Sequence, residues 1–154
     1  MSDYTNDVEF QRAIQENQAR RLRFMETANR ERADIIRDLG ALGWPCDRLN
    51  DITKYLPLSE RVIDCLLQWV TRTSVDNLRE SLIHILACTR QRFPGGVLVN
   101  AYKSTDHIGV QFGVLRAIAS CDLTGIDDFI DLTILPSEHL RNQLKGLGYR
   151  FRKK

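Results

Sequence analysis

The feature that most constrains the fold is an apolar pattern that recurs after 32 residues. Residues 66–87 align without gaps on residues 98–119, and ten of the 22 aligned positions are apolar in both segments. The same offset continues into a third copy, with apolar residues at Phe129, Ile130, Leu140, Leu144 and Leu147. Each copy consists of an apolar stretch, a polar turn and a second apolar stretch. A period of this length is typical of supersecondary units that bury their apolar faces by stacking on their neighbours.

Apolar spacings of three and four residues predict helices throughout this region. Ser59 is expected to cap a helix that ends near Thr71 or Thr73, and Asp76 begins the next helix. Further helices are expected over residues 97–103, 108–120, 126–135 and 138–147. Because few stretches favour strand, we predict an all-α fold: a short right-handed superhelical stack of antiparallel helix pairs.

The first forty residues do not match the repeat. Residues 7–39 contain no Gly or Pro and are rich in Glu, Gln, Arg and Ala, which predicts one long helix or two helices joined by a bend. A short helical turn over residues 47–54 is then expected to place Leu49, Ile52 and Tyr55 inward. The chain therefore divides into an N-terminal helical cap (1–43), the repeats (44–148) and a basic C-terminal tail (149–154).

Three segments carry the motifs of a known family over roughly residues 42–147: LGALGWP, which begins at Leu39 and precedes a helix pair, LLQWVTRTSVDNLRESLIHILA as the first full repeat, and LRAIAS at the end of the second. Together they resemble the HEAT-repeat and broader armadillo-like family. The resemblance implies that the second helix of each pair lines a concave surface. The third unit departs from the pattern at Pro136, Asn142 and Arg150, so it is expected to be a terminal cap. These degenerate motifs specify a fold rather than an activity.

The charge distribution favours a protein partner over nucleic acid. The chain has 22 Lys and Arg against 20 Asp and Glu, but four of the basic residues are Arg150, Arg152, Lys153 and Lys154 at its end. The repeat region therefore lacks the basic excess of a nucleic-acid groove. We predict a non-catalytic protein-binding module that uses its concave helix row or its N-terminal helix. A nucleic-acid-binding protein and an accessory factor to an enzyme or chromophore protein are the alternatives.

Other function classes lack their sequence signatures. No apolar run is long enough to span a membrane, and the first thirty residues contain no apolar signal region, so a cytoplasmic location is expected. The four cysteines include no CxxC pair, which predicts reduced structural thiols and no metal site. The sequence contains no GxSxG, GxxxxGK[ST] or HExxH motif. We therefore predict no catalytic residue and no cofactor.

The candidate contact residues lie on the predicted second helices. Glu80, His84 and Arg116 occupy their less apolar side, and His84 aligns with Arg116 at the offset of 32. His107 and His139 are also one repeat apart, each near the start of a second helix. They could form a row across the inner surface, although a preference for a polar residue at a helix start explains them more simply.

Several other features have a functional and a structural interpretation. Trp44 could be an exposed binding aromatic, but packing against the first repeat is the interpretation that we favour. An acidic cluster invites a calcium site, yet its spacing lacks an EF-hand pattern and suits a helix start better; it comprises Asp122, Asp127, Asp128 and Asp131. The basic tail could track phosphates or serve as a solubilising end. The helix over residues 108–120 has a second apolar face with Ile108, Phe112 and Leu115, which is expected to pack against a neighbouring helix.

Overall fold

The computed structural model describes residues 3–131 and 137–151, which are predominantly helical. This confirms the predicted all-α class in its coarse form. Two short strands correct the expectation of an entirely helical chain. The elements are α1 (Asp3–Ala41), the 3-10 helix η1 (Leu49–Tyr55), α2 (Glu60–Arg72), α3 (Asp76–Thr89), β1 (Arg92–Pro94), α4 (Gly96–Ser104), α5 (Ile108–Ser120), β2 (Asp122–Thr124), α6 (Asp127–Phe129) and α7 (Glu138–Gly146).

Side-chain caps and apolar spacing place these helices close to their predicted positions. Ser59 accepts a hydrogen bond from the Val62 N–H at 3.3 Å and begins α2, as its sequence context predicts. The apolar run at 97–99 lies within α4, in agreement with the helix expected over residues 97–103. The helix predicted over residues 126–135 corresponds to the short α6, while Pro136 and the end of that prediction lie outside the described residues.

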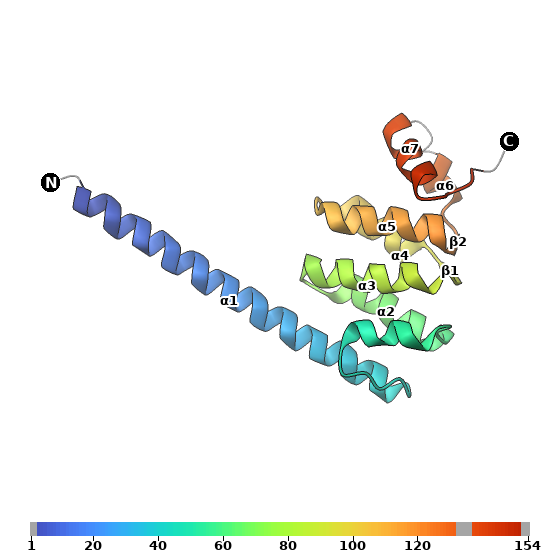
Figure 1. The fold of residues 1–154 in the computed structure, drawn as a ribbon, viewed down its shortest axis with the longest axis horizontal. Helices are drawn as coiled ribbons and strands as arrows, with labels where there is room; N and C mark the ends of the chain where they lie inside the picture. Colours follow the sequence, from blue (N-terminus) through green and yellow to red (C-terminus); the bar gives the residue numbers. More distant parts are fainter. Residues whose placement is uncertain (1–2, 132–136, 152–154) are drawn as a thin grey trace.

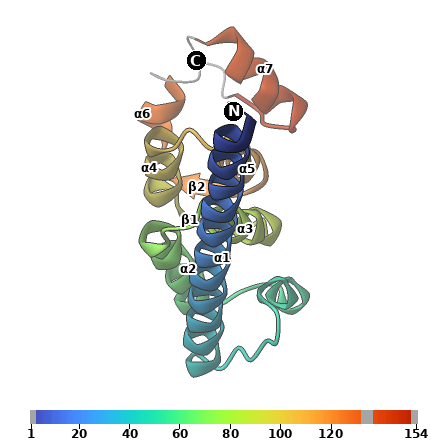
Figure 2. The ribbon, with the colours of Figure 1, turned by 90° about the vertical axis from the view of Figure 1, so that its left-hand side faces the viewer.

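The helices α2 to α5 form two layers. The pairs α2–α3 and α4–α5 lie one above the other (Figure 1), and the view in Figure 2 separates α2 and α4 from α3 and α5. The most extensive helix–helix contact joins α3 to α5, and α2 contacts α4 within the other layer. At the two ends, η1 packs against α3 and α7 packs against α5. The second helices of successive pairs are therefore direct neighbours.

The strands β1 and β2 follow α3 and α5 and pair in parallel, with Phe93 opposite Leu123. The Gly95 N–H extends the pairing by donating to the Thr124 carbonyl at 2.9 Å. A Cβ atom at Gly95 would lie 2.4 Å from Ile126 Cγ2, so this close backbone approach requires glycine. The sequence predicts a break at this point but not a strand, because three residues are too few to show a period of two.

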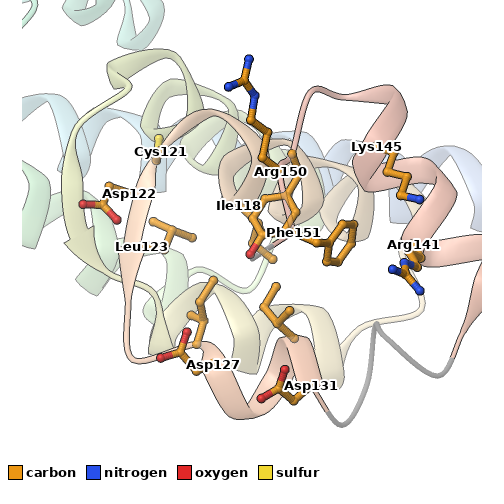
Figure 3. A pocket seen from close by; sticks show the side chains of 13 residues that line it. Ile118, Cys121, Asp122, Leu123, Asp127, Asp131, Arg141, Lys145, Arg150 and Phe151 are labelled. Carbon is orange, nitrogen blue, oxygen red and sulfur yellow. The ribbon is translucent and has the colours of Figure 1, made fainter. Parts of the chain in front are cut away.

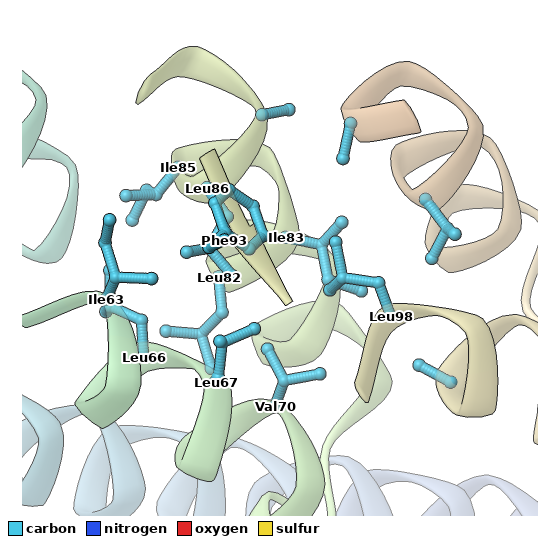
Figure 4. Close-up of a cluster of buried hydrophobic side chains, with 14 of the residues drawn as sticks. Ile63, Leu66, Leu67, Val70, Leu82, Ile83, Ile85, Leu86, Phe93 and Leu98 are labelled. Carbon is cyan, nitrogen blue, oxygen red and sulfur yellow. The ribbon is translucent and has the colours of Figure 1, made fainter. Parts of the chain in front are cut away.

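The core lies between the two layers and follows the 32-residue pattern. Figure 4 shows side chains of α2 and α3 meeting between their helices, together with Phe93 and Leu98. Six aligned apolar residues are all buried: Leu66 with Leu98, Leu82 with Val114, and Leu86 with Ile118. Full burial of a large aliphatic side chain contributes about 1.5–3 kcal/mol. The repeated positions therefore hold the helix pairs together.

Helix α1 is one continuous helix, which settles the choice between one helix and two. Its packing against the rest of the described chain begins at Ala28 and centres on the buried Ile35 and Leu39, whereas residues 6–26 are exposed throughout. Within the predicted N-terminal cap (1–43), only this last third contacts the helix layers. Despite its length, α1 is too polar to cross a membrane, and no other helix in the described ranges has the required length and hydropathy.

Two polar contacts attach the last third of α1 to α2 and to the turn that follows it. The indole N–H of Trp69 donates to Asp38 Oδ2 at 2.9 Å. The Glu31 carboxylate accepts the Thr73 hydroxyl at 2.6 Å and the Ser74 hydroxyl at 3.0 Å. Burial alone would raise the pKa of Glu31, but the hydrogen bonds from Thr73 and Ser74 outweigh it and hold that pKa below its ordinary value. Glu31 thus acts as an ionised clamp.

The turn after α1 is partly as predicted. Leu49 and Ile52 of η1 are buried, as the spacing indicates, whereas Tyr55 is exposed and corrects the expectation that it points inward. Its ring lies edge-on to Trp44, with 6.0 Å between ring centroids. The tyrosine therefore covers the tryptophan from the outside rather than entering the core.

Candidate contact surface on helices α3 and α5

Four of the five predicted contact residues come together where α3 meets α5. Glu80 and His84 are on α3, Arg116 is on α5, and His107 stands immediately before α5. We define the α3–α5 face as the exposed and half-buried side chains of Glu80, His84, Cys88, Ile108, Phe112 and Arg116. Trp44 is the fifth candidate, and it lies elsewhere.

His84 is held between two partners in the middle of the α3–α5 face. Arg116 Nη1 lies 3.4 Å from His84 Nδ1, and His84 Nε2 lies 3.7 Å from Cys88 Sγ. Because a guanidinium only donates, Nδ1 accepts and Nε2 carries the proton that points to sulfur. In this arrangement the imidazole donates to the thiol rather than accepting its proton. The contact therefore fixes the orientation of three surface side chains.

His107 has a structural role that the sequence also suggests. Its Nδ1 accepts a hydrogen bond from the Val110 N–H at 3.2 Å and caps α5. Glu80 Oε2 lies 4.0 Å from the same nitrogen. Because the capping bond uses the lone pair of Nδ1, that atom has no proton for Glu80, and we regard the cap as the dominant interaction. His107 therefore caps α5 beside the α3–α5 face and is not one of its contact residues.

Glycine lets Glu80 approach α5 closely. A Cβ atom at Gly109 would lie 2.4 Å from the Glu80 carboxylate carbon, so this carboxylate occupies the space that a side chain would fill. The neighbouring Gly113 faces Ile83 in the same helix contact. His139 does not extend the row: it is exposed on α7, and no hydrogen bond joins it to His107, which is also among the described residues.

Two large apolar side chains lie exposed on the α5 side of the face. Ile108 is 80% exposed and Phe112 is 47% exposed. The prediction that this second apolar side of the helix packs against a neighbour is therefore wrong for both residues, although Leu115 is buried as expected. Apolar spacing identifies a side that disfavours water, but not what covers it. The exposed pair lies one helical turn apart on the same side of α5.

Trp44 is separated from these residues. It lies in the loop after α1, which Figure 1 places at the opposite end of the helix layers from α7. The tryptophan is half-buried, packs against the hydrophobic core and contacts Tyr55. The structure thus agrees with the packing interpretation of Trp44 and does not bring it to the α3–α5 face.

A cavity of about 1080 Å³ lies near the C-terminal end. Figure 3 shows Asp127 and Asp131 on one wall, and Arg141 and Lys145 of α7 on another. Opposite charges on different walls give the cavity no clear preference for an anion or a cation. Asp127 and Asp128 form the first turn of α6, a position that favours carboxylates. The cavity therefore offers less for a functional argument than the α3–α5 face.

The start of the basic tail is packed. The Tyr149 N–H donates to the Leu144 carbonyl at 2.9 Å, and the Tyr149 and Phe151 rings pack edge to face at 4.8 Å. Arg141 lies over the Phe151 ring at 5.3 Å. Tyr149 and Phe151 therefore pack against α7. Residues 152–154 lie outside the described residues.

Within the described ranges, no group of three His, Cys, Asp or Glu side chains is arranged to hold a metal ion. The four cysteines are free and half-buried. Burial raises the pKa of the Cys65 thiol, and the Asp38 carboxylate raises it further. Burial likewise raises the pKa of Cys46. A raised pKa lowers the thiolate fraction and the reactivity of these two residues, which suits structural thiols.

Comparison with known proteins identifies no relative of this chain. The chain matches no family model, no curated protein and no solved structure. The HEAT-like resemblance therefore stays a prediction from the sequence.

Proposed function

We propose that this protein is a HEAT-like helical-repeat adaptor that binds another protein through its α3–α5 face and performs no catalysis itself. In this proposal the helix pairs form a short right-handed superhelical stack, and α3 and α5 line its binding side. The partner is a folded protein with a mixed apolar and polar surface.

The helix register supports the repeat arrangement. Residues that differ by 32 in number contact each other across α3 and α5, as His84 does with Arg116, and Thr89 Oγ1 with Cys121 Sγ at 3.9 Å. Ser120 Oγ also donates to the Ala87 carbonyl at 2.9 Å, at a separation of 33 residues. Equivalent positions of successive units that lie side by side are what a stacked repeat requires.

The composition of the face supports a protein partner, and this is the observation that carries the proposal. Exposed Ile108 and Phe112 stand beside Arg116, whose guanidinium is positioned by His84. Aromatic and arginine side chains are enriched where proteins contact each other, and apolar area at the centre of such a contact provides most of the affinity. One arginine and one glutamate give this face no basic excess for nucleic acid.

The proposal can be tested by affinity capture from the native cell with two charge-matched variants. One variant alters the face, with Ile108→Asp, Phe112→Asp and Arg116→Glu. The control alters exposed positions of the α2 and α4 layer, with Arg61→Glu, Gln68→Glu and Asn100→Asp. Both sets change the net charge by the same amount. We expect the wild type and the control to capture the same protein partner, and the face variant to lose it.

Three outcomes would contradict the proposal. Repeated capture of no specific protein would remove its basis, and equal capture by all three proteins would place the contact elsewhere. The third outcome comes from a gel-shift titration with salt. If the wild type binds nucleic acid at moderate salt and the face variant does not, the nucleic-acid alternative is favoured.

A further inference from the structure

The exposed part of α1 has an apolar stripe that continues the buried side of the same helix. The stripe consists of Phe10, Ile14, Phe24, Met25 and Ala28, of which Ala28 already packs against the hydrophobic core. At about 100° per residue, these five positions fall within about 60° of the line between Ile35 and Leu39 on the helix surface. Ile35 and Leu39 are buried, whereas all stripe residues before Thr27 are exposed. On the same side of α1, Asn17, Gln18 and Arg21 separate Phe10 and Ile14 from Phe24 and Met25. The chain thus leaves both of these apolar pairs uncovered.

A helix with this stripe needs a partner to be stable in water. Single helices gain most of their stability in proteins from packing of their apolar side rather than from local propensity. The described chain provides no such packing for residues 6–26. Phe10 alone leaves 66% of its surface in solvent. The first half of α1 extends away from the helix layers (Figure 1). Something outside this chain is therefore required to cover the stripe.

The charges of the exposed segment are separated along its length. Residues 6–16 contain Asp7, Glu9 and Glu16 against the single Arg12. Residues 17–28 contain Arg20, Arg21 and Arg23 against the single Glu26. Two such helices in antiparallel orientation place each acidic half beside a basic half. A parallel pair would place like charges side by side, which is unfavourable.

We propose that the stripe is covered by the same stripe of a second copy, so that two α1 helices pair in antiparallel orientation. The paired segment, residues 10–28, is about 27 Å long at 1.5 Å per residue. Because α1 extends away from the helix layers (Figure 1), an antiparallel pair places the two sets of layers at opposite ends of this segment. The pairing uses a different surface from the α3–α5 face and does not depend on the proposed function.

A groove beside α1 fits this orientation. It has a volume of about 540 Å³ and lies between α1 and the turn before α3, with Phe24 and Val75 among its lining residues. Arg20 and Arg23 line the same groove. In an antiparallel pair, the acidic first half of the second copy reaches this basic region.

A matched pair of substitutions tests the location of the contact. Val8 and Phe10 are 67% and 66% exposed, but Val8 points to the opposite side of the helix from the stripe. In sedimentation velocity of the full chain, we expect the wild type to be a dimer. Phe10→Glu should weaken self-association more than about tenfold, because the pairing would bury a carboxylate among apolar side chains. Val8→Glu should leave the dimer intact.

The charge arrangement is tested by two complementary variants. One replaces Asp7, Glu9 and Glu16 by Arg, which makes the whole exposed segment basic. The other replaces Arg20, Arg21 and Arg23 by Glu, which makes it acidic. Each variant should be monomeric alone, and an equimolar mixture should form heterodimers, more weakly at high salt. Cysteines introduced at Ile14 in one protein and at Phe24 in another then report orientation in their mixture, since antiparallel chains paired over residues 10–28 bring residue 14 beside residue 24, whereas parallel chains bring each residue beside itself.

Each remaining outcome would overturn the proposal. A monomeric wild type at the concentrations tested would do so, whether the stripe then binds another protein or vesicles of anionic phospholipid. A dimer that survives Phe10→Glu, or that Val8→Glu weakens equally, would place the contact elsewhere. Crosslinks only between identical positions would show a parallel pair and contradict the charge argument.

Discussion

The two ends of α1 share one helix and one apolar side, yet only one end is covered by the chain itself. Between Glu31 and Leu39, apolar burial coincides with polar contacts to Trp69, Thr73 and Ser74. Between residues 6 and 26 the apolar side continues without burial, and no side chain there bonds to another described element. An apolar stripe therefore shows that a side requires cover, and the polar contacts show where this chain provides it.

This difference matters because apolar contacts and polar contacts differ in how strictly they require one geometry. An apolar stripe can slide or accept a different partner, since burial of apolar surface is not directional. A charged hydrogen bond such as that of Glu31 with Thr73 requires one geometry. The covered end of α1 is thus specified by both kinds of contact, and the exposed end only by the first.

Loss of apolar burial at the covered end should have the largest effect. Leu39 is fully buried, so Leu39→Ala should lower the free energy of unfolding by about 2–5 kcal/mol. Leu22→Ala removes the same atoms from an exposed site off the stripe and should change that free energy by less than about 0.5 kcal/mol. Urea unfolding followed by circular dichroism measures both. Equal losses for the two variants would contradict the division of α1 into a covered and an exposed end.

Removal of the bond between α1 and Trp69 should have the next largest effect. Asp38→Ala leaves the indole N–H of a buried tryptophan without its acceptor, at a cost of about 1–3 kcal/mol in unfolding free energy. Asp34→Ala is the control, one turn away, because within the described residues Asp34 forms its ion pair with the exposed Arg37. A surface pair of this kind contributes about 0–1 kcal/mol. A smaller loss for Asp38→Ala than for Asp34→Ala in urea unfolding would show that the indole contact does not secure α1.

The sequence predicts much of this arrangement because helix boundaries are local. Caps such as Ser59 and spacings of three and four residues depend only on neighbours along the chain, so α2, α3 and α5 begin and end near their expected residues. The offset of 32 also predicts that His84 and Arg116 occupy equivalent positions. Once α3 and α5 are neighbours, equivalent positions become adjacent positions, and the two side chains meet.

The remaining features depend on the distance between elements, which the sequence does not reveal. The contacts from Glu31 to Thr73 and from Asp38 to Trp69 join residues 42 and 31 positions apart, and no local pattern marks either pair. The exposure of Phe112 depends on whether another helix follows α5 on that side. One sequence signal could have suggested these two contacts. It is the pair of acidic residues at positions 31 and 38, which lie two turns apart on the last third of α1.

The ionised Glu31 clamp should give the covered end of α1 a specific dependence on pH. Because the pKa of Glu31 is lower in the folded chain than in the unfolded chain, its contribution is complete at neutral pH and is lost as the pH falls through the folded pKa. Glu31→Gln should cost on the order of 1 kcal/mol in unfolding free energy at pH 7, and less at pH 3.5. Urea midpoints of both proteins at the two pH values measure this. A difference that stays constant or grows in acid would contradict an ionised clamp.

Removal of the exposed end should have the smallest effect on folding and thereby isolates its role. A chain that begins at residue 27 keeps Glu31, Ile35, Asp38 and Leu39, so its unfolding free energy at low protein concentration should change by less than about 0.5 kcal/mol. A chain that begins at residue 39 lacks Glu31, Ile35 and Asp38, so the unfolding free energy of its helix layers should fall by several kcal/mol. The shorter truncation should nevertheless abolish self-association in sedimentation velocity. Loss of both stability and self-association in the chain that begins at residue 27 would show that the two ends of α1 act as one structural unit.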